Sequence, residues 1–276
     1  MIPIAVLLQI SALQVQPQDA PLPPPLHYGA KEMTCPVGGE RFSTSLAIMY
    51  TTYGVRPDGR PYSYLPFPLP IPECPTNRLV IFDDFNSDEV ARLDELVGSR
   101  EYSDLIDRET SYYRAYWLAS RLNRDEGVVL SLLLRAVWEA TPATMGALNT
   151  PRDRARARQY NVEFVQRVEG RWDSITPDER MAFYARAANA HRVLGNFSRA
   201  EPMRERALSA LQTTSAKMAD GWDKYLATLG KVILRRDRSV EPLDMIPERQ
   251  IKFACRERKR LNRFEAGICR TQTATR

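Results

Sequence analysis

The stretch MAFYARAANAHRVLGNFSRAEPMRERALSAL, residues 181–211, decides the fold class of this chain. Its apolar residues recur at helical spacing on both sides of Gly195-Asn196, so it predicts two helices, Met181 to Leu194 and Arg199 to Leu211. Small residues inside both helices allow close packing, and Gly195 permits a tight turn between them. The stretch therefore predicts an antiparallel helical pair.

The spacing within this pair resembles a tetratricopeptide repeat. Counted from Met181, the characteristic large, small and turn positions of the repeat are occupied by Tyr184, Ala188, Gly195, Phe197, Ala200, Ala207 and Leu208. The pattern departs from the repeat at His191 and Arg204, where aromatic residues are usual, and at Pro202. A fainter second copy places Arg135-Ala136 on Arg206-Ala207. The resemblance implies an array of helical hairpins that pack these alanines against one another.

Helical patterns extend from this pair in both directions along the chain. Thr176-Pro177-Asp178-Glu179 predicts a helix start, with Thr176 as the cap and Glu179 completing a capping box. Ser87 is expected to cap an earlier helix whose apolar stripe runs from Val90 to Val97. Further helices are predicted over residues 112–122, 128–140, 152–168, 223–234 and 247–266.

Residues 30–82 have strand and turn patterns instead of helical ones. Phe42 to Val55 is rich in strand-forming residues, and the following Arg56-Pro57-Asp58-Gly59-Arg60 predicts a tight turn, because Pro presets φ and Gly accepts a positive φ. Alternating prolines keep the segment from Tyr62 to Pro72 extended. Leu79 to Phe82 is a candidate short strand.

These patterns predict a mostly α protein with a small N-terminal β/turn module followed by antiparallel helical hairpins. The expected divisions are an apolar leader or signal peptide (1–20), a Pro-rich tether (21–30), a β module (31–82), a helical array (83–246), and a basic C-terminal helix and tail (247–276).

Two short motifs in the β module resemble the knuckles of a zinc ribbon. A ribbon uses Cys-Pro-x-Cys-Gly twice, because a tight turn then points two thiolates at one tetrahedral ion. Here Gly38 and Asn77 stand where the second thiolate of each knuckle belongs, after Cys35-Pro36 and Cys74-Pro75. With the aromatic helix near 112–119, the chain resembles a bacterial family of unknown function that pairs a two-knuckle ribbon with repeat-like helices. The resemblance implies an architecture but no reaction.

The resemblance bears on the pairing of the cysteines. A ribbon metal would have held Cys35 and Cys74 side by side, which implies that they now join covalently, while Cys255 and Cys269 form a separate local pair. The alternative is a zinc site that recruits His27. Four cysteines allow three pairings and the sequence alone does not choose among them. We favour disulfides over zinc and predict no cofactor.

The N-terminal segment suggests a compartment. An apolar stretch from Ile2 to Leu13 followed by prolines at 21–25 is typical of a signal peptide and tether, and an even number of cysteines fits an oxidising compartment. We therefore expect a periplasmic or secreted protein. The early residues contain no Lys or Arg and no small-x-small cleavage site, so a cytoplasmic location is the alternative. No apolar run approaches the roughly 18 residues of a membrane span.

Charge is unevenly distributed along the chain, whose formal net charge is +5. The segment from Asp83 to Glu109 contains ten acidic residues and three arginines, whereas the segment from Lys231 to Arg276 contains thirteen Lys or Arg and six acidic residues. Such polarity can attract nucleic acid or anionic lipid. The basic runs 152–158 and 256–260 contain no aromatic residue for base stacking, so we interpret both as solvated helix faces and do not expect nucleic-acid binding.

The sequence contains no motif that indicates an enzyme. A Gly-rich phosphate loop, a Gly-x-Ser-x-Gly elbow and a His-Glu-x-x-His motif are all absent from it. Asp83-Asp84 is interpreted as an acidic helix approach and His191 as a hydrogen-bonded core residue. We therefore expect a non-enzymatic scaffold of the bacterial cell envelope that binds a protein or peptide on the concave face of its tetratricopeptide-like helices. The alternative is a cytosolic zinc- or nucleic-acid-binding regulator.

Overall fold

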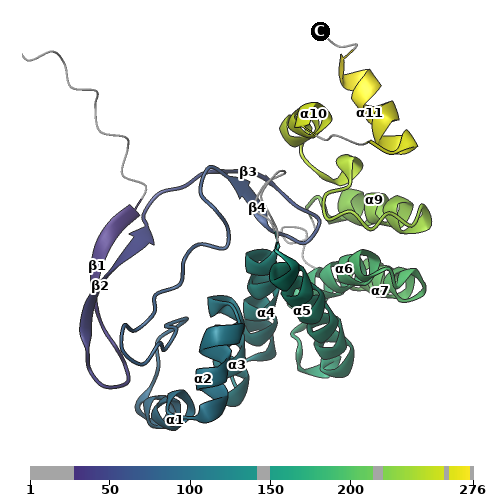
Figure 1. Ribbon diagram of the computed structural model, residues 1–276. Coiled ribbons are helices and arrows are strands. Elements are labelled where there is room, and N and C mark those ends of the chain that lie inside the picture. Colours follow the sequence, from purple (N-terminus) through teal and green to yellow (C-terminus); the bar gives the residue numbers. More distant parts are fainter. Residues whose placement is uncertain (1–27, 142–149, 214–219, 258–260, 274–276) are drawn as a thin grey trace, which may run out of the picture.

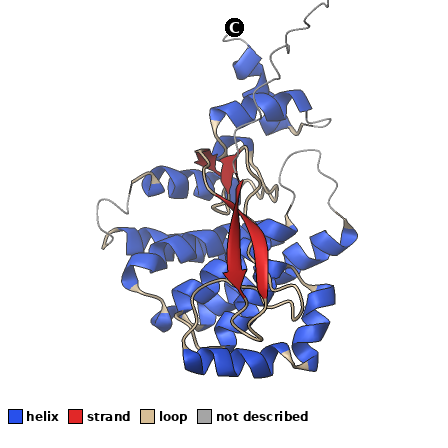
Figure 2. Cartoon of the chain, turned by 90° about the vertical axis from the view of Figure 1, so that its left-hand side faces the viewer, coloured by secondary structure: helices blue, strands red, loops and turns tan. Residues whose placement is uncertain are grey.

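A computed structural model describes residues 28–141, 150–213, 220–257 and 261–273. Over these residues the chain is mostly helical with a small β region at its N-terminal side (Figures 1 and 2), which confirms the coarse fold class. The tetratricopeptide type of the hairpins stays a prediction. The leader, most of the tether with His27, and the run Arg258 to Arg260 lie outside the described residues. Within the described part, no helix is both long and apolar enough to cross a bilayer.

The β region consists of two separate antiparallel hairpins. β1 (Tyr28–Thr34) pairs with β2 (Arg41–Ala47), with Tyr28 opposite Ala47. β3 (Thr52–Val55) pairs with β4 (Pro61–Ser63). β1 therefore starts inside the predicted tether 21–30, because its pairing with the end of β2 extends the hairpin to Tyr28.

Two strand predictions are wrong in detail. The strand-like stretch 42–55 is broken between Ala47 and Thr52, where the chain passes from one hairpin to the other. The expected strand at 79–82 is only a single bridge between Val80 and Glu73. Pro72 and Pro75 flank that bridge and have no N–H to extend a ladder.

Two short helices follow the β region. α1 (Ser87–Val97) is capped by Asn86, not by Ser87: the Asn86 side chain accepts from the Glu89 N–H, and the Glu89 carboxylate accepts from the Asn86 N–H. Glu89 lies three residues after Asn86, so only Asn86 can complete this box. α2 (Arg100–Arg108) was not predicted, because its sequence is largely polar and it buries little besides Tyr102.

The central helices each pack against the next in sequence. They are α3 (Ser111–Arg121), α4 (Glu126–Ala140), α5 (Pro151–Gly170), α6 (Pro177–Leu194), α7 (Phe197–Leu211) and α9 (Trp222–Leu234). Gly195 ends α6 with φ 86°, a left-handed conformation that reverses the chain into α7 as predicted. The capping box at Thr176 is wrong: its hydroxyl donates to the Glu179 carboxylate at 2.6 Å and does not accept from the backbone of α6.

The predicted single helix over 247–266 is two helices. They are α10 (Glu248–Glu257) and α11 (Arg263–Thr273). Two single turns of 3₁₀ helix, η1 (Trp172–Ser174) and η2 (Leu243–Met245), lie earlier in the chain. Asn262 starts α11 by accepting from the Glu265 N–H at 2.9 Å, an interaction that favours a new helix start over a continued one.

One large core joins the first hairpin to helices α1 to α9, and a small second core lies under α10 and α11. The aromatic helix α3 is buried along almost its whole length, so its aromatic side chains form core and not a ligand cage. The small core includes Tyr62, Leu243, Ile246, Ala254 and Cys269, and it ties β4 to the C-terminal helices.

Candidate functional site: a β-turn held by the helical array

The β3–β4 hairpin projects its turn, residues 56–60, against the helices (Figure 1). The Arg56 N–H donates to the Arg60 carbonyl at 2.8 Å, and Gly59 has φ 89°, so the turn that the sequence predicts is present. Unlike most turns at the surface, it is buried: Arg56 is 2% exposed, Asp58 8% and Arg60 5%. Burial at this level requires partners for every polar group of the turn.

The charged side chains of the turn satisfy one another. The guanidinium of Arg56 forms a two-pronged ion pair with the carboxylate of Asp58, which also accepts from the Arg60 N–H at 3.1 Å. Burial alone would raise the pKa of Asp58, but the adjacent Arg56 charge outweighs it and holds that pKa below its ordinary value. Burial together with the nearby Arg56 lowers the pKa of Arg60 to about 10.

The main-chain carbonyls of the turn accept hydrogen bonds from side chains of three helices. The Pro57 carbonyl accepts from Arg186 of α6 at 2.6 Å and from the Tyr225 hydroxyl of α9 at 2.7 Å. The Asp58 carbonyl accepts from the Trp138 indole N–H of α4 at 3.1 Å. Because each contact is made to a backbone carbonyl, the helices hold the turn by its main chain.

The turn also completes the end of a helix. Arg60 donates to the carbonyls of Trp138 at 2.9 Å and Thr141 at 2.8 Å, at the C-terminal end of α4, where carbonyls no longer have a full set of intrahelical donors. Arg186 is itself fixed, since its guanidinium lies 4.8 Å from the Trp222 ring centroid and 5.0 Å from that of Tyr225. The turn and the three helices therefore form one interlocked unit.

Residues 237–241, which follow α9, contact both β4 and α6. Tyr62 of β4 donates to Glu241 at 2.7 Å. Arg192 of α6, fully buried, donates to the carbonyls of Asp237 at 2.7 Å and Ser239 at 2.8 Å. Burial lowers the pKa of Arg192 to about 10. This segment is therefore fixed against α6 through its main chain as well.

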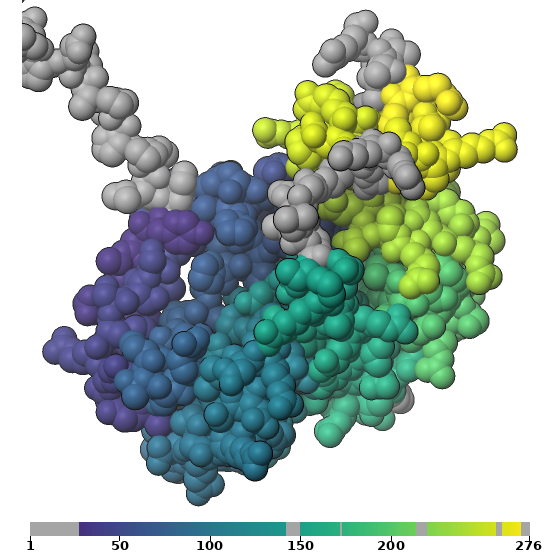
Figure 3. Space-filling view, in the orientation of Figure 1, coloured from purple at the N-terminus to yellow at the C-terminus, as the bar shows by residue number. Residues whose placement is uncertain are grey.

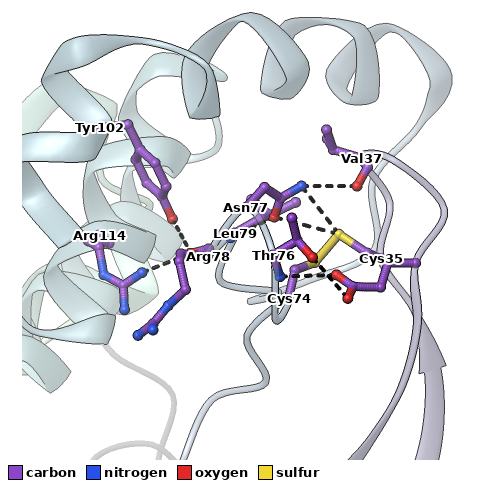
Figure 4. Close-up of a disulfide and its surroundings, with 10 residues drawn as sticks. Cys35, Val37, Cys74, Thr76, Asn77, Arg78, Leu79, Tyr102 and Arg114 are labelled. Carbon is purple, nitrogen blue, oxygen red and sulfur yellow. Dashed lines mark hydrogen bonds between the residues drawn. A yellow bond between two sulfur atoms is a disulfide. The ribbon is translucent and has the colours of Figure 1, made fainter.

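The paired knuckles form the second candidate site, shown in Figure 4. Cys35 and Cys74 form a disulfide with Cα atoms 5.6 Å apart. Both turns have the same backbone hydrogen bond, from the cysteine N–H to the carbonyl five residues later: Cys35 to Glu40 at 2.7 Å and Cys74 to Leu79 at 2.9 Å. Gly39 and Arg78 occupy equivalent places in them, with φ 66° and 60°.

Asn77 links the two knuckles where a ribbon would place a thiolate. Its side-chain amide donates to the Val37 carbonyl at 3.0 Å and lies 3.6 Å from the Cys35 sulfur, while its oxygen accepts from the Leu79 N–H at 3.0 Å. The second knuckle is fixed to the helices, because Tyr102 and Arg114 both donate to the Arg78 carbonyl at 2.8 Å (Figure 4).

The knuckles contain no thiolate for a metal ion, because both sulfurs are in the disulfide. In the described part of the chain, no three His, Cys, Asp or Glu side chains are grouped so that they could hold a metal. Cys255 and Cys269 form the second disulfide, which joins α10 to α11 with Cα atoms 5.5 Å apart. The four cysteines thus form the Cys35–Cys74 pair that the resemblance implied and the separate local pair Cys255–Cys269.

The repeat positions lie together between α6 and α7. Ala188, Ala200 and Ala207 are fully buried and Tyr184 is 7% exposed, while Phe197 and Leu208 are half-buried against the core. His191 is buried with its Nε2 3.0 Å from Glu169, which confirms it as a hydrogen-bonded core residue. Burial lowers the pKa of His191, so its neutral form is favoured.

Two charged stretches have partners that the sequence did not reveal. Arg152 and Arg156, predicted as part of a solvated face, donate to the carbonyls of Asp107 and Arg108 at the end of α2. Arg152 is exposed, as that prediction requires, whereas Arg156 is half-buried against the end of α2, whose C-terminal carbonyls attract cations. Asp83 forms an ion pair with Arg124 at 3.2 Å.

The helices leave an open groove on the other side of the repeat pair. The groove has a volume of about 500 Å³ and lies between the start of α6 and the end of α7. Its lining combines apolar groups and charged rim residues: Pro177, Arg180, Tyr184, Pro202, Glu205, Arg206, Ser209, Ala210 and Thr213.

Comparisons with known proteins identify no relative for this chain: no family model, no curated protein and no solved structure matches it. The ribbon-and-repeat family accordingly stays a prediction.

Proposed function

We propose that this chain is a non-enzymatic scaffold of the bacterial cell envelope that binds a protein or peptide on its tetratricopeptide-like helical surface. The observation that carries the proposal is the open α6–α7 groove, which combines apolar surface with charged and hydroxyl groups at its rim. The contact of α4, α6 and α9 with the main chain of the 56–60 turn supports it, because these helices already hold one peptide segment through its carbonyls.

The contact with the turn also bears on where a partner would bind. The surface shared by α4, α6 and α9 is already filled by the chain's own turn, whose charged residues are at most 8% exposed. A partner that competed there would have to replace the contacts that Arg186, Tyr225 and Trp138 make to the Pro57 and Asp58 carbonyls. We therefore place the partner in the α6–α7 groove and not on the occupied face.

The groove has the mixture of groups that peptide sites use. Tyr184, Pro177 and Pro202 supply apolar surface, and Arg206 and Ser209 are exposed at the rim with hydrogen-bonding groups. The groove is lined by residues of α6 and α7, and the packing of these two helices against each other fixes its shape.

Two disulfides support the envelope as the location. Disulfides persist in oxidising compartments and are rare in the cytoplasm. Each also joins segments of the chain that would otherwise be linked only by their own packing.

The test is site-specific photocrosslinking in the native envelope. A photoreactive residue would replace Arg206 or Ser209 in the groove, and matched controls would replace Arg92 of α1 or Ser103 of α2, which are also exposed. The proposal predicts one defined protein adduct from the groove positions and none from the controls. Equal adducts at all four positions, or none at any, would contradict it.

A further inference from the structure

The connection between the two hairpins carries an unusual density of exposed apolar side chains. Ile48 and Met49 are consecutive and are 65% and 67% exposed, and Tyr50 and Tyr53 beside them are 44% and 38% exposed. This surface, the 48–53 loop, is held in place from below: the Tyr64 hydroxyl donates to the Met49 carbonyl at 3.0 Å, and Tyr50 contacts Phe67 edge-on at 5.3 Å.

The outer face of α10 lies next to this loop. Arg249, Lys252, Phe253 and Arg256 follow one another at spacings of three and four, so they share one side of the helix, and all four are exposed. The opposite side packs toward α11, to which Cys255 is joined by its disulfide. α10 therefore presents three basic side chains around one exposed aromatic ring, of which Lys252 also pairs with Glu248 at 2.8 Å.

Direct contacts join the two surfaces into one. The Arg249 guanidinium lies 5.2 Å from the Tyr53 ring centroid, and Gln250 donates to the Tyr53 hydroxyl at 3.4 Å. Pro247 lies against Gly54, where a Cβ would come within 2.3 Å of it. These contacts place the 48–53 loop beside the outer face of α10, and the C-terminal helices lie at the upper end of the molecule in Figures 1 and 3.

Charge is distributed unevenly between the two ends of the molecule. Residues 247–276 contain nine Lys or Arg and three acidic residues. The acidic segment 83–109 forms α1 and α2, which lie at the opposite end from α10 and α11 in Figure 1. A negatively charged plane would therefore attract the α10 end and repel the α1–α2 end, which orients the molecule.

We infer that this end of the molecule docks on the surface of a bilayer that contains anionic lipids. Ile48, Met49 and Phe253 enter the boundary between headgroups and acyl chains, and Tyr50 and Tyr53 lie at the headgroup level, where tyrosine is favoured. Arg249, Lys252 and Arg256 bind lipid phosphates. The inference is independent of the partner groove, which lies on α6 and α7.

The exposed apolar pair favours lipid over nucleic acid. A phosphate backbone in water offers nothing to the aliphatic side chains of Ile48 and Met49, whereas a bilayer removes them from water. A nucleic acid would need the basic face of α10 alone. The two occupants therefore differ in whether the 48–53 loop contributes to binding.

The experiment measures binding of the full chain to sedimented vesicles of phosphatidylcholine alone or with one third phosphatidylglycerol. The triple variant Arg249→Gln, Lys252→Gln, Arg256→Gln should weaken binding to the anionic vesicles on the order of a hundredfold, since each cation near an anionic surface contributes roughly fivefold. Ile48→Ser with Met49→Ser should weaken it on the order of tenfold. The leader is common to every variant and cancels from these ratios.

Two controls match these changes. Arg92→Gln, Arg100→Gln, Arg171→Gln removes the same charge from exposed positions elsewhere, and Leu234→Ser removes an apolar side chain that is 85% exposed on α9. Both should bind like the unaltered chain. The inference is overturned if the control triple loses as much binding as the α10 triple. It is also overturned if the Ile48–Met49 variant binds vesicles normally, or if duplex DNA displaces the vesicles.

Discussion

At the scale of single residues, Asp58 is central to the 56–60 turn. It is the buried counter-ion of Arg56, it fixes the Arg60 N–H, and its own carbonyl accepts from Trp138. A buried ion pair is costly to form but more costly to break on one side, because the remaining charge then lies in a poorly solvating interior. The turn therefore depends on this carboxylate more than on any of its apolar contacts.

Asp58→Asn should lower the free energy of unfolding by about 3 to 5 kcal/mol, because it removes the carboxylate that pairs with the buried Arg56 guanidinium. Urea unfolding followed by circular dichroism would measure this, with the exposed Asp104→Asn of α2 as control. A loss no larger than that of Asp104→Asn would contradict the role of Asp58.

The pH dependence of stability follows from the same carboxylate. Its pKa in the folded protein lies below the ordinary 3.8, so its contribution is fully present above pH 3.8 and is lost as the pH falls through the folded pKa. The unaltered chain should therefore lose stability steeply below about pH 4, and Asp58→Asn less so. Urea titrations at a series of pH values would test this; parallel slopes for both proteins would count against it.

A comparison of Gly59 and Gly38 separates two costs of a Gly→Ala change: the cost of a left-handed backbone and the cost of a close side-chain contact. Both have left-handed backbones, at φ 89° and 85°, but a Cβ on Gly59 would lie 2.9 Å from Arg186, while nothing lies within 4 Å of one on Gly38. Each change to Ala should cost about 1 to 2 kcal/mol for the backbone, and Gly59→Ala should cost about 1 to 3 kcal/mol more for overpacking. Thermal unfolding would show the difference, and equal losses would mean that Arg186 gives way freely.

At the scale of elements, local sequence signals predicted some features and missed others for physical reasons. The Pro57–Gly59 turn, the Gly195 reversal and the Thr176–Pro177 helix start were visible because each depends on nearby residues. α2 was missed because its stability comes from packing Tyr102 against the second knuckle. The break between α10 and α11 was missed because it depends on the cap at Asn262 and on a disulfide across the turn.

The C-terminal disulfide should stabilise its two helices locally. Closing its 14-residue separation contributes about 3 kcal/mol on the chain-entropy model. Cys255→Ser with Cys269→Ser should speed amide hydrogen exchange in α10 and α11 and leave α6 and α7 unchanged, because the small core is separate from the large one. Exchange that rises equally in all four helices would show that the two cores unfold together.

At the scale of the whole molecule, the candidate site was only partly accessible from sequence. The turn at 56–60 and the helix that contains Arg186 were each predicted, but their contact joins residues 129 positions apart through backbone carbonyls. Such a contact leaves no periodic pattern in the sequence. The surface shared by α4, α6 and α9 holds the chain's own turn, and for this reason we place the proposed partner in the α6–α7 groove.

The knuckles were also only partly predictable from sequence. The cysteines were singled out by a resemblance, and their pairing agrees with what that resemblance implied. The bridging role of Asn77 was not foreseen, although its place in the motif was noted. Closing the 39-residue separation between Cys35 and Cys74 contributes roughly 4 kcal/mol on the chain-entropy model.

The most direct test of an envelope scaffold held by two disulfides is the intact mass of the natively purified chain after thiol alkylation, with and without prior reduction. We expect no cysteine to be alkylated before reduction and four alkyl groups to add after it. Alkylation of all four cysteines without reduction would contradict both the disulfides and the oxidising compartment, and would favour the cytosolic alternative.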